Sequence, residues 1–276
     1  MDRCICKGAV ARRLLLIAGL AAGAAGLASC METSAVPDTV RSELAAAGTL
    51  RAALNTGNAI LVSVRPAGPP AGVAADLAAD LARRLGVPLA LVPYPSAAAI
   101  ADDAASGRWD VAFIGSDPAR ENSVIFSAPY VELPSTYLVP AGSAIASVAD
   151  VDVAGVRVAA RPRTAYDLVL RRILSKASLV YPEDGLSDLA LLTGGRADAL
   201  AGLRQVLADI AATLPGSRVL NDDFAAIQQA IAVPRGRAAA AAYLESFVAD
   251  ITSSGLVAAA IERNTARGAV VAGRVR

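Results

Sequence analysis

The sequence has 276 residues, with 26 Lys and Arg against 25 Asp and Glu and a formal net charge of +1. A nucleic-acid partner needs a basic face to neutralise phosphates, and here the arginines are scattered among comparable numbers of acids. The sequence contains no histidine, and its three cysteines, Cys4, Cys6 and Cys30, all precede residue 31. Zinc sites normally draw on His or Cys, and Ser-His or Cys-His catalysis requires an imidazole base. We therefore expect no nucleic acid, no metal, no cofactor and no catalytic residue in a chain long enough for one large domain or two lobes.

The first 29 residues have the charge pattern of an export signal. Four basic residues within positions 1–13 precede an uncharged apolar run from 14 to 29. That run is shorter than the roughly 20 residues that a helix needs to span a bilayer. We interpret residues 1–29 as a signal peptide that directs export to the periplasm, and an uncleaved membrane anchor is the alternative.

The apolar run ends at Leu27-Ala28-Ser29-Cys30, which resembles the lipobox of bacterial lipoproteins. In such proteins the cysteine becomes the lipidated first residue of the mature chain. The resemblance implies a membrane anchor on Cys30, and ordinary cleavage nearby with Cys30 incidental is the alternative. We expect residues 30–47 to form a tether.

Short β-prone runs and longer helical runs alternate after residue 50. The run at 72–85 is amphipathic, with Val73, Leu77, Leu81 and Leu85 on one stripe. Further strands are expected at 50–54, 89–92 and 111–114, and a second helix at 97–106. This alternation predicts a parallel sheet with right-handed crossovers.

The same rhythm restarts after a segment rich in Pro, Ser and Gly at 130–147, which we interpret as the crossing between two lobes. Strands are expected at 156–160, 179–181, 199–201 and 218–220, with helices at 165–174, 186–192 and 204–213. The chain returns at 224–233, before two C-terminal helices at 237–253 and 257–264. We therefore assign residues 48–137 plus 228–265 to lobe 1, residues 138–227 to lobe 2, and residues 266–276 to a loose tail.

Five sequence blocks in a fixed order resemble the bacterial extracellular solute-binding protein family 3. They are GVAADLA at 72–78, LGV at 85–87, GRWDVA at 107–112, DPAR at 117–120 and FSAPY at 126–130. The later block GGRADA at 194–199 resembles the family's second-lobe signature. The resemblance covers roughly residues 46–265. It implies the two-lobed, type II periplasmic-binding-protein-like α/β fold, in which each lobe is a central sheet flanked by helices and two crossing hinge strands join the lobes. It also implies hinge closure on a ligand that is delivered to an ABC transporter permease.

The resemblance places Arg120 at the arginine of the family's Thr-x-x-Arg motif, which grips the α-carboxylate of the ligand. A guanidinium presents paired donors that match the two oxygens of a carboxylate. Gly115 stands where many members have Ser or Thr, so a hydroxyl is missing and only the backbone N–H remains. Ser116 or Asp117 compensates in the ligand site, or both serve the turn and helix cap before Pro118.

In lobe 2, Thr164 and Ala165 open a helix at the position of the family's Gly-Thr-Thr segment, with Arg163 in place of the usual Gly. A helix N-terminus offers free N–H groups to an anion, and Thr164 is a good N-cap in either case. In lobe 1, Asn55 and Asn58 follow the first strand and can supply donors and acceptors, although Asn58 also suits a turn. The tyrosines at 94, 130, 137 and 166 are candidate pocket walls.

A departure from the family follows Asp198. Amino-acid binders of this family generally place an Asp five residues further on to hold the ammonium of the ligand, and here that position is Leu203, followed by Arg204. We infer that the ligand is not an ordinary α-amino acid, and that Arg120 and Arg204 face one another across an anion. The alternative for Arg204 is a solvated helix residue.

These features together predict an extracytoplasmic, monomeric, non-enzymatic solute-binding protein of an ABC transporter. Its ligand is a small carboxylate or an amino-acid-like solute. One alternative is a periplasmic dehydratase that acts on a cyclic carboxylic acid, with Asp117, Glu132 or Asp167 as general acid. Another is a sensory ligand-binding protein.

Overall fold

The computed structural model describes residues 36–183 and 185–273. The expected signal peptide and the lipidation site at Cys30 lie outside the described residues. Within the described part, no single helix is long and apolar enough to cross a membrane, and only α7 (Ala238–Ser253) and α8 (Leu256–Arg263) pass that test as a pair, bent by 68°.

The first lobe is built on three parallel strands in the order β2-β1-β3. They are β1 (Leu50–Asn55), β2 (Leu89–Tyr94) and β3 (Val111–Gly115). Helices α2 (Val73–Leu85) and α3 (Ala97–Asp102) connect them. The predicted apolar stripe of α2 is fully buried in the core of this lobe. This helix ends at Gly86, whose φ of 69° is the left-handed conformation that glycine adopts without a steric penalty.

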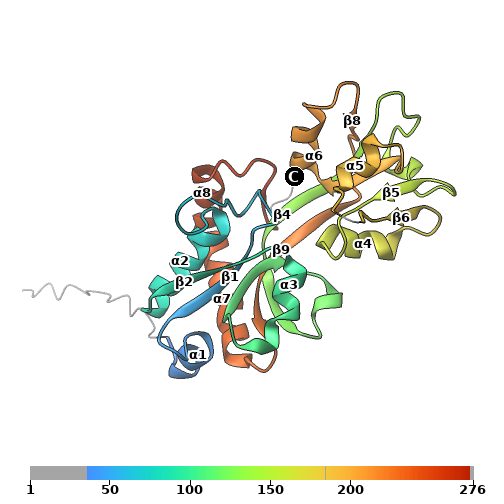
Figure 1. The fold of residues 1–276 in the computed structure, drawn as a ribbon. Helices are drawn as coiled ribbons and strands as arrows, with labels where there is room; N and C mark the ends of the chain where they lie inside the picture. Colours follow the sequence, from blue (N-terminus) through green and yellow to red (C-terminus); the bar gives the residue numbers. More distant parts are fainter. Residues whose placement is uncertain (1–35, 184, 274–276) are drawn as a thin grey trace, which may run out of the picture. The chain divides into compact units, whose positions relative to one another are not determined.

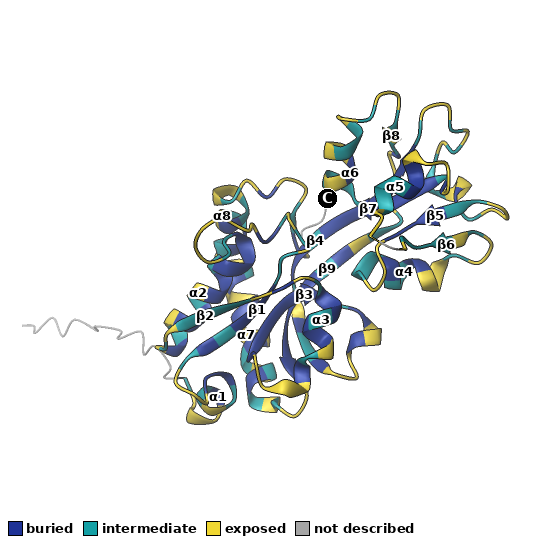
Figure 2. Ribbon diagram, viewed as in Figure 1, coloured by how far each residue is buried: buried dark blue, intermediate teal, exposed yellow. Residues whose placement is uncertain are grey.

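The second lobe repeats this arrangement with three more parallel strands. These are β5 (Arg157–Ala159), β6 (Ser178–Val180) and β7 (Ala199–Leu203), with helices α4 (Ala165–Ile173), α5 (Asp188–Thr193) and α6 (Arg204–Ala211). Separate apolar clusters support this lobe, one around Tyr137 and Leu170 and the other around Leu191 and Leu207. In Figure 2 the inner strands of both lobes are mostly buried, the outer strands β2 and β6 are partly buried, and exposed positions gather on the helices and loops.

Two long antiparallel strands join the lobes, as Figure 1 shows. Strand β4 (Val124–Val139) pairs with β7, and β9 (Ala225–Pro234) pairs with β3. The path of paired strands is therefore β2-β1-β3-β9-β4-β7-β5-β6, and the sheet is mixed rather than parallel throughout. The predicted crossing at 130–147 begins too late, because its Pro and Ser residues do not break the strand. The β4–β9 register shifts earlier in the strand, between Phe126 and Val131.

Two expectations for the ends of the chain are wrong. The tether predicted at 30–47 contains helix α1 (Asp38–Leu44), whose Val40 and Leu44 are buried in the first core. The loose tail predicted at 266–276 contains β10 (Val270–Val271), which pairs antiparallel with β4. The described parts of both segments bury apolar side chains against the first lobe, and elements this short leave little periodicity in a sequence.

A Gly-Arg-x-Asp block fixes the start of the equivalent strand in each lobe. Asp110, just before β3, receives hydrogen bonds from the backbone and guanidinium of Arg51 on β1. Asp198, just before β7, receives the same set from Arg157 on β5. These forks hold neighbouring parallel strands in register, so that their carboxyl ends meet at one edge.

Candidate functional site

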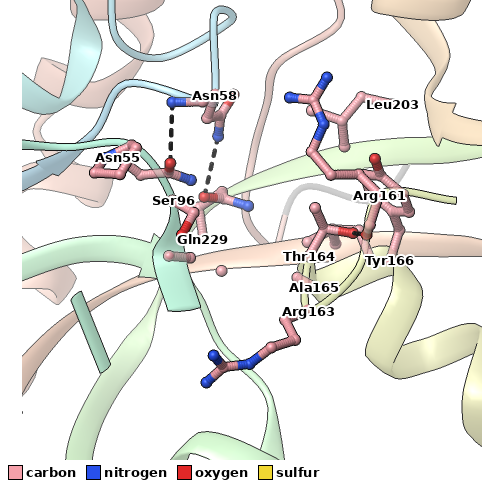
Figure 3. Close-up of a pocket in the computed structure, with 15 residues that line it drawn as sticks. Asn55, Asn58, Ser96, Arg161, Arg163, Thr164, Ala165, Tyr166, Leu203 and Gln229 are labelled. Atoms are coloured by element: carbon pink, nitrogen blue, oxygen red, sulfur yellow. Dashed lines mark hydrogen bonds between the residues drawn. The ribbon is translucent and has the colours of Figure 1, made fainter. Parts of the chain in front are cut away.

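A pocket lies at the carboxyl ends of strands from both lobes, the usual place for ligands in open α/β sheets (Figure 3). It encloses about 540 Å³ of space, part of which is open to solvent. The first lobe and β9 contribute polar amides and small residues: Asn55, Gly57, Asn58, Pro95, Ser96, Ala97, Gly115, Ile227 and Gln229. The second lobe contributes Arg161, Arg163, Thr164, Ala165, Tyr166 and Leu203.

The first-lobe wall is uncharged and carries amide groups. Asn58 donates from Nδ2 to Oε1 of Gln229 at 3.4 Å, and Gln229 is itself almost fully buried on β9. Oδ1 of Asn58 accepts no hydrogen bond from any described residue. Asn55 accepts from the Gly57 N–H at 3.1 Å, and Ser96 caps α3 by accepting from the Ala99 N–H. This wall suits a ligand with neutral polar groups.

The second-lobe wall is the N-terminus of α4. Thr164 caps the helix, because its hydroxyl accepts from the Asp167 N–H at 3.2 Å and donates to the Arg161 carbonyl at 2.9 Å. The preceding residue, Arg163, has a φ of 59°, in the left-handed region that glycine favours. Burial, followed by the charge of Asp188, raises the pKa of Tyr166 to about 12, so its hydroxyl stays protonated at neutral pH. This wall offers a hydroxyl and free backbone N–H groups.

The two pocket arginines point in different directions, as Figure 3 shows. The guanidinium of Arg163 turns away from Asn58 and forms a bidentate pair with Asp102, at 2.9 and 2.6 Å. The guanidinium of Arg161 extends past Leu203 toward the side of Asn58. Its ion-pair partner is Asp188, at 3.8 Å. The described lining residues include no Asp or Glu, so the charged groups at the pocket wall are guanidinium groups, each with a carboxylate partner outside the lining.

Arg120 does not line the pocket. Its side chain is buried under Gly115, donating from Nη1 to the Gly115 carbonyl at 2.5 Å and from Nη2 to the Arg163 carbonyl at 2.9 Å. Burial lowers the pKa of this guanidinium, although the nearby charge of Asp117 acts in the opposite direction. Arg120 therefore joins the two lobes through backbone oxygens of both.

Gly115 and Ala165 do line the pocket, and they meet across it. A Cβ placed on Gly115 would lie 2.8 Å from the Ala165 Cβ, closer than side-chain carbons approach one another. Only a glycine allows this approach of β3 to the start of α4. In this structure the two residues occupy the space where the missing hydroxyl at position 115 would stand.

Ser116 and Asp117 serve the turn and the helix cap before Pro118, which is one of the two alternatives that the sequence left open for them. Neither lines the pocket. Asp117 caps the turn Pro118–Arg120 by accepting from the Ala119 N–H, and its other oxygen pairs with Arg172 at 2.7 Å. Ser116 bonds the Gln228 carbonyl through its backbone N–H and its hydroxyl.

Arg204 lies at the start of α6 and does not face Arg120. Its guanidinium pairs with Asp223 and donates to the backbone carbonyls of Leu220 and Asp222, each at 2.8 Å. The side chain therefore holds the loop before β9, and the expected pair of arginines across an anion is not formed. It is not a freely solvated helix residue either.

Several lining residues were not among the predicted ligand contacts: Ser96, Arg161, Ile227 and Gln229. Ser96 and Arg161 each follow a predicted strand closely, which is a usable signal for cleft residues. Ile227 and Gln229 lie on the returning strand β9, and only its register decides which of its side chains reach the pocket. Of the candidate tyrosine walls, Tyr166 lines the pocket, whereas Tyr94, Tyr130 and Tyr137 are buried in the lobe cores.

The described residues contain no cluster of His, Cys, Asp and Glu that could hold a metal ion. The possible general acids also lie elsewhere. Asp117, Glu132 and Asp167 do not line the pocket. Asp167, in the first turn of α4, is fully buried and accepts from the Tyr181 hydroxyl, the Arg163 N–H and Arg171.

Solved structures with this fold include solute-binding proteins for amino acids. One is AbpA, an amino acid ABC transporter substrate-binding protein from Streptococcus pneumoniae bound to L-arginine, with 22% identity, 81% of this chain and 97% of that chain covered, and a TM-score of 0.66. Another is a solute receptor for L-cysteine from Neisseria gonorrhoeae, with 22% identity, coverage of 82% and 92%, and a TM-score of 0.67.

A third is the ancestral amino acid-binding protein AncCDT-1, a precursor of cyclohexadienyl dehydratase, with 24% identity, coverage of 81% and 97%, and a TM-score of 0.66. Among curated protein sequences, none matches this chain at a significant level. The structural neighbours confirm the two-lobed, type II periplasmic-binding-protein fold. The family model for the bacterial extracellular solute-binding proteins, family 3, matches residues 50–265, and the chain therefore belongs to that family.

Proposed function

We propose that this protein captures a small carboxylate-bearing solute outside the cytoplasm and presents it to an ABC permease. The observation that carries the proposal is the composition of the pocket. Residues of both lobes line it, and among the described lining residues the charged side chains are Arg161 and Arg163, with no Asp or Glu. Such a site favours an anion and offers no partner to an ammonium group.

The proposal separates this chain from the neighbours that bind arginine and cysteine. An α-amino acid carries both a carboxylate and an ammonium, and a buried ammonium without a carboxylate partner is strongly disfavoured. Leu203 occupies the position at which the family resemblance implies an Asp. An organic acid with hydroxyl, keto or amide groups fits the amide wall of Asn58 and Gln229 better.

Capture proceeds through hinge closure between the lobes. Strands β4 and β9 connect the lobes, and the pocket needs residues from both sides. A ligand that contacts both walls therefore favours the arrangement in which the lobes are together. The lipobox-like sequence at Cys30 supports a lipid anchor, and we expect the chain to act as a monomer beside its permease.

A thermal-shift screen of the refolded full chain tests the proposal, since refolding removes any ligand carried through purification. The probes are lactate, pyruvate, malate, succinate, pyroglutamate and 4-hydroxybenzoate, compared with L-arginine, L-cysteine and L-glutamine. A ligand at about 100 times its Kd stabilises the folded state by about 2.7 kcal/mol. We expect stabilisation by at least one acid that lacks an amine. Stabilisation by the amino acids alone, or by none of the probes, would contradict the proposal.

One structural neighbour favours the enzymatic alternative, because AncCDT-1 is a precursor of cyclohexadienyl dehydratase. The pocket, however, brings none of Asp117, Glu132 and Asp167 to its surface. Incubation of the stabilising acid with the protein, followed by mass spectrometry, distinguishes the two functions. A binding protein returns the acid unchanged, whereas a dehydratase returns a product lighter by one water.

A further inference from the structure

We propose that Arg161 of the second lobe, and not Arg120 of the first, holds the carboxylate of the solute. The inference rests on the proposed function and adds which lobe recognises the charge. It also assigns Arg120 a positioning role. The ligand class that follows is a small carboxylate whose remaining polar groups are neutral and face the first lobe.

Arg120 does not line the pocket. The residue is 5% exposed, and each terminal nitrogen of its guanidinium donates to a backbone carbonyl, one from each lobe. Gly115, whose carbonyl accepts from Arg120, and Ala165 line the pocket in its place and lie close together. A carboxylate that took these two Arg120 donors would have to replace a carbonyl bond in each lobe.

Arg161 has the opposite environment. Its side chain is 57% exposed, lines the pocket, and extends toward the side of Asn58 (Figure 3). No hydrogen bond joins its guanidinium to any other described residue. Its backbone is held in place, because the Thr164 hydroxyl and the Thr164 N–H both donate to the Arg161 carbonyl. With its backbone fixed and its guanidinium hydrogen-bonded to no other described residue, Arg161 keeps its donors available to a ligand.

Asp188 balances the charge of Arg161 without accepting a hydrogen bond from its guanidinium. The two groups are 3.8 Å apart, beyond the 2.7–3.2 Å range of N–H···O hydrogen bonds. A solute carboxylate can therefore take the donors of the guanidinium while the ion pair remains. The free N–H groups at the start of α4 add positive potential at the same wall.

The first-lobe wall determines the other end of the solute. Asn58 and Gln229 present amide groups, and Oδ1 of Asn58 lacks a donor among the described residues. Leu203 adds an apolar contact beside Arg161. A hydroxyl or amide N–H on the solute would complete the hydrogen bonding of Asn58, and an ammonium would meet no carboxylate.

Calorimetric titration of four proteins tests the assignment with the acid that stabilises the chain most and with its carboxamide, which lacks the charge. The variants are Arg161→Gln, Arg120→Gln and, as a matched control, Arg196→Gln, which changes an exposed arginine of the second lobe outside the pocket. We expect Arg161→Gln to weaken binding of the acid by about 10- to 100-fold, the range for hydrogen bonds to charged groups, and to leave binding of the carboxamide within about threefold. Arg196→Gln should bind both as the parent does.

The outcomes separate this assignment from the proposed function. If the parent chain binds no amine-free acid, the proposed function fails and the assignment fails with it. If the parent binds the acid and Arg161→Gln binds it equally well, the function stands and the assignment is wrong. An equal loss for acid and carboxamide in Arg161→Gln also overturns it, as does a selective loss of acid binding in Arg120→Gln. Arg120→Gln should instead weaken both ligands to a similar degree, because it loosens the contact between the lobes.

Discussion

At the scale of single residues, three positions at which the family resemblance implies other residues, Gly115, Arg163 and Ala165, lie at the same contact between the lobes. Gly115 removes a hydroxyl, and the space is taken by Ala165. Arg163 replaces a glycine and keeps the left-handed backbone, with a φ of 59°. Its carbonyl accepts from Arg120. Gly115 and Ala165 thus make one close contact between β3 and the start of α4, and the hydrogen bond from Arg120 to the Arg163 carbonyl also joins the two lobes.

Gly115→Ala tests that contact. The added methyl would lie 2.8 Å from the Ala165 Cβ, and such overpacking costs about 1–3 kcal/mol. We expect a matching fall in the free energy of unfolding, measured with urea. The double variant Gly115→Ala with Ala165→Gly should recover most of the loss. A single variant as stable as the parent would mean that this approach is not kept in solution.

At the scale of elements, the Asp of each Gly-Arg-x-Asp block accepts the same set of hydrogen bonds from an arginine on the neighbouring strand, but the two Asp side chains differ in burial. The side chain of Asp110 is 1% exposed and pairs with both Arg51 and Arg237, whereas that of Asp198 is 38% exposed and pairs with Arg157. The arginine hydrogen bond to Asp198 also holds the pKa of that carboxyl below its usual range. The same sequence block therefore contributes a different amount to the free energy of unfolding in each lobe.

Asp110→Ala and Asp198→Ala form a matched pair of variants. Removing one partner of a buried ion pair costs about 3–5 kcal/mol, because a charge is left uncompensated. A largely exposed pair contributes about 1 kcal/mol or less. We expect Asp110→Ala to lower the free energy of unfolding by the larger amount in urea titrations. Equal losses in the two variants would show that burial does not distinguish the forks.

At the scale of the whole molecule, side chains link the lobes in addition to β4 and β9. Asp102 of the first lobe pairs with Arg163, and the buried Asp117 pairs with Arg172 of α4. The hydrogen bond from Arg163 lowers the pKa of Asp102 below its ordinary value of 3.8. The pair therefore favours contact between the lobes above about pH 4, and this contribution is lost as the pH falls further.

Small-angle scattering of the ligand-free chain tests these links. We expect the radius of gyration to increase in the double variant Asp102→Asn with Arg172→Gln, because both pairs across the pocket are removed. The exposed pair Arg83–Asp80 lies within one helix, so Arg83→Gln is the control and should leave the radius unchanged. A double variant that scatters like the parent would mean that these two ion pairs do not hold the lobes together.

The elements were predictable where periodicity is long. The apolar stripe of α2 and the alternation of strands and helices in both lobes follow from which side chains avoid water. The elements missed, α1 and β10, have seven and two residues and show no comparable pattern. Their burial depends on α7 and β4, which lie far away in the sequence.

The candidate site was partly predictable for a topological reason. Residues directly after parallel strands gather at one edge of a sheet, and Asn55, Gly115, Thr164 and Ala165 accordingly line the pocket. Gln229 was not predictable in this way, because it lies inside the antiparallel strand β9.

The sequence by itself determined the family, the rhythm of strands and helices, and the absence of an acid at position 203. These depend on local composition and spacing, which a linear chain displays directly. Only the tertiary structure decided which acceptors each arginine binds and which arginine lines the pocket. A guanidinium binds whichever acceptors surround it, and those of Arg120 and Arg204 are carbonyls and a carboxylate brought close by folding. Arg161 lines the pocket with its guanidinium hydrogen-bonded to no other described residue.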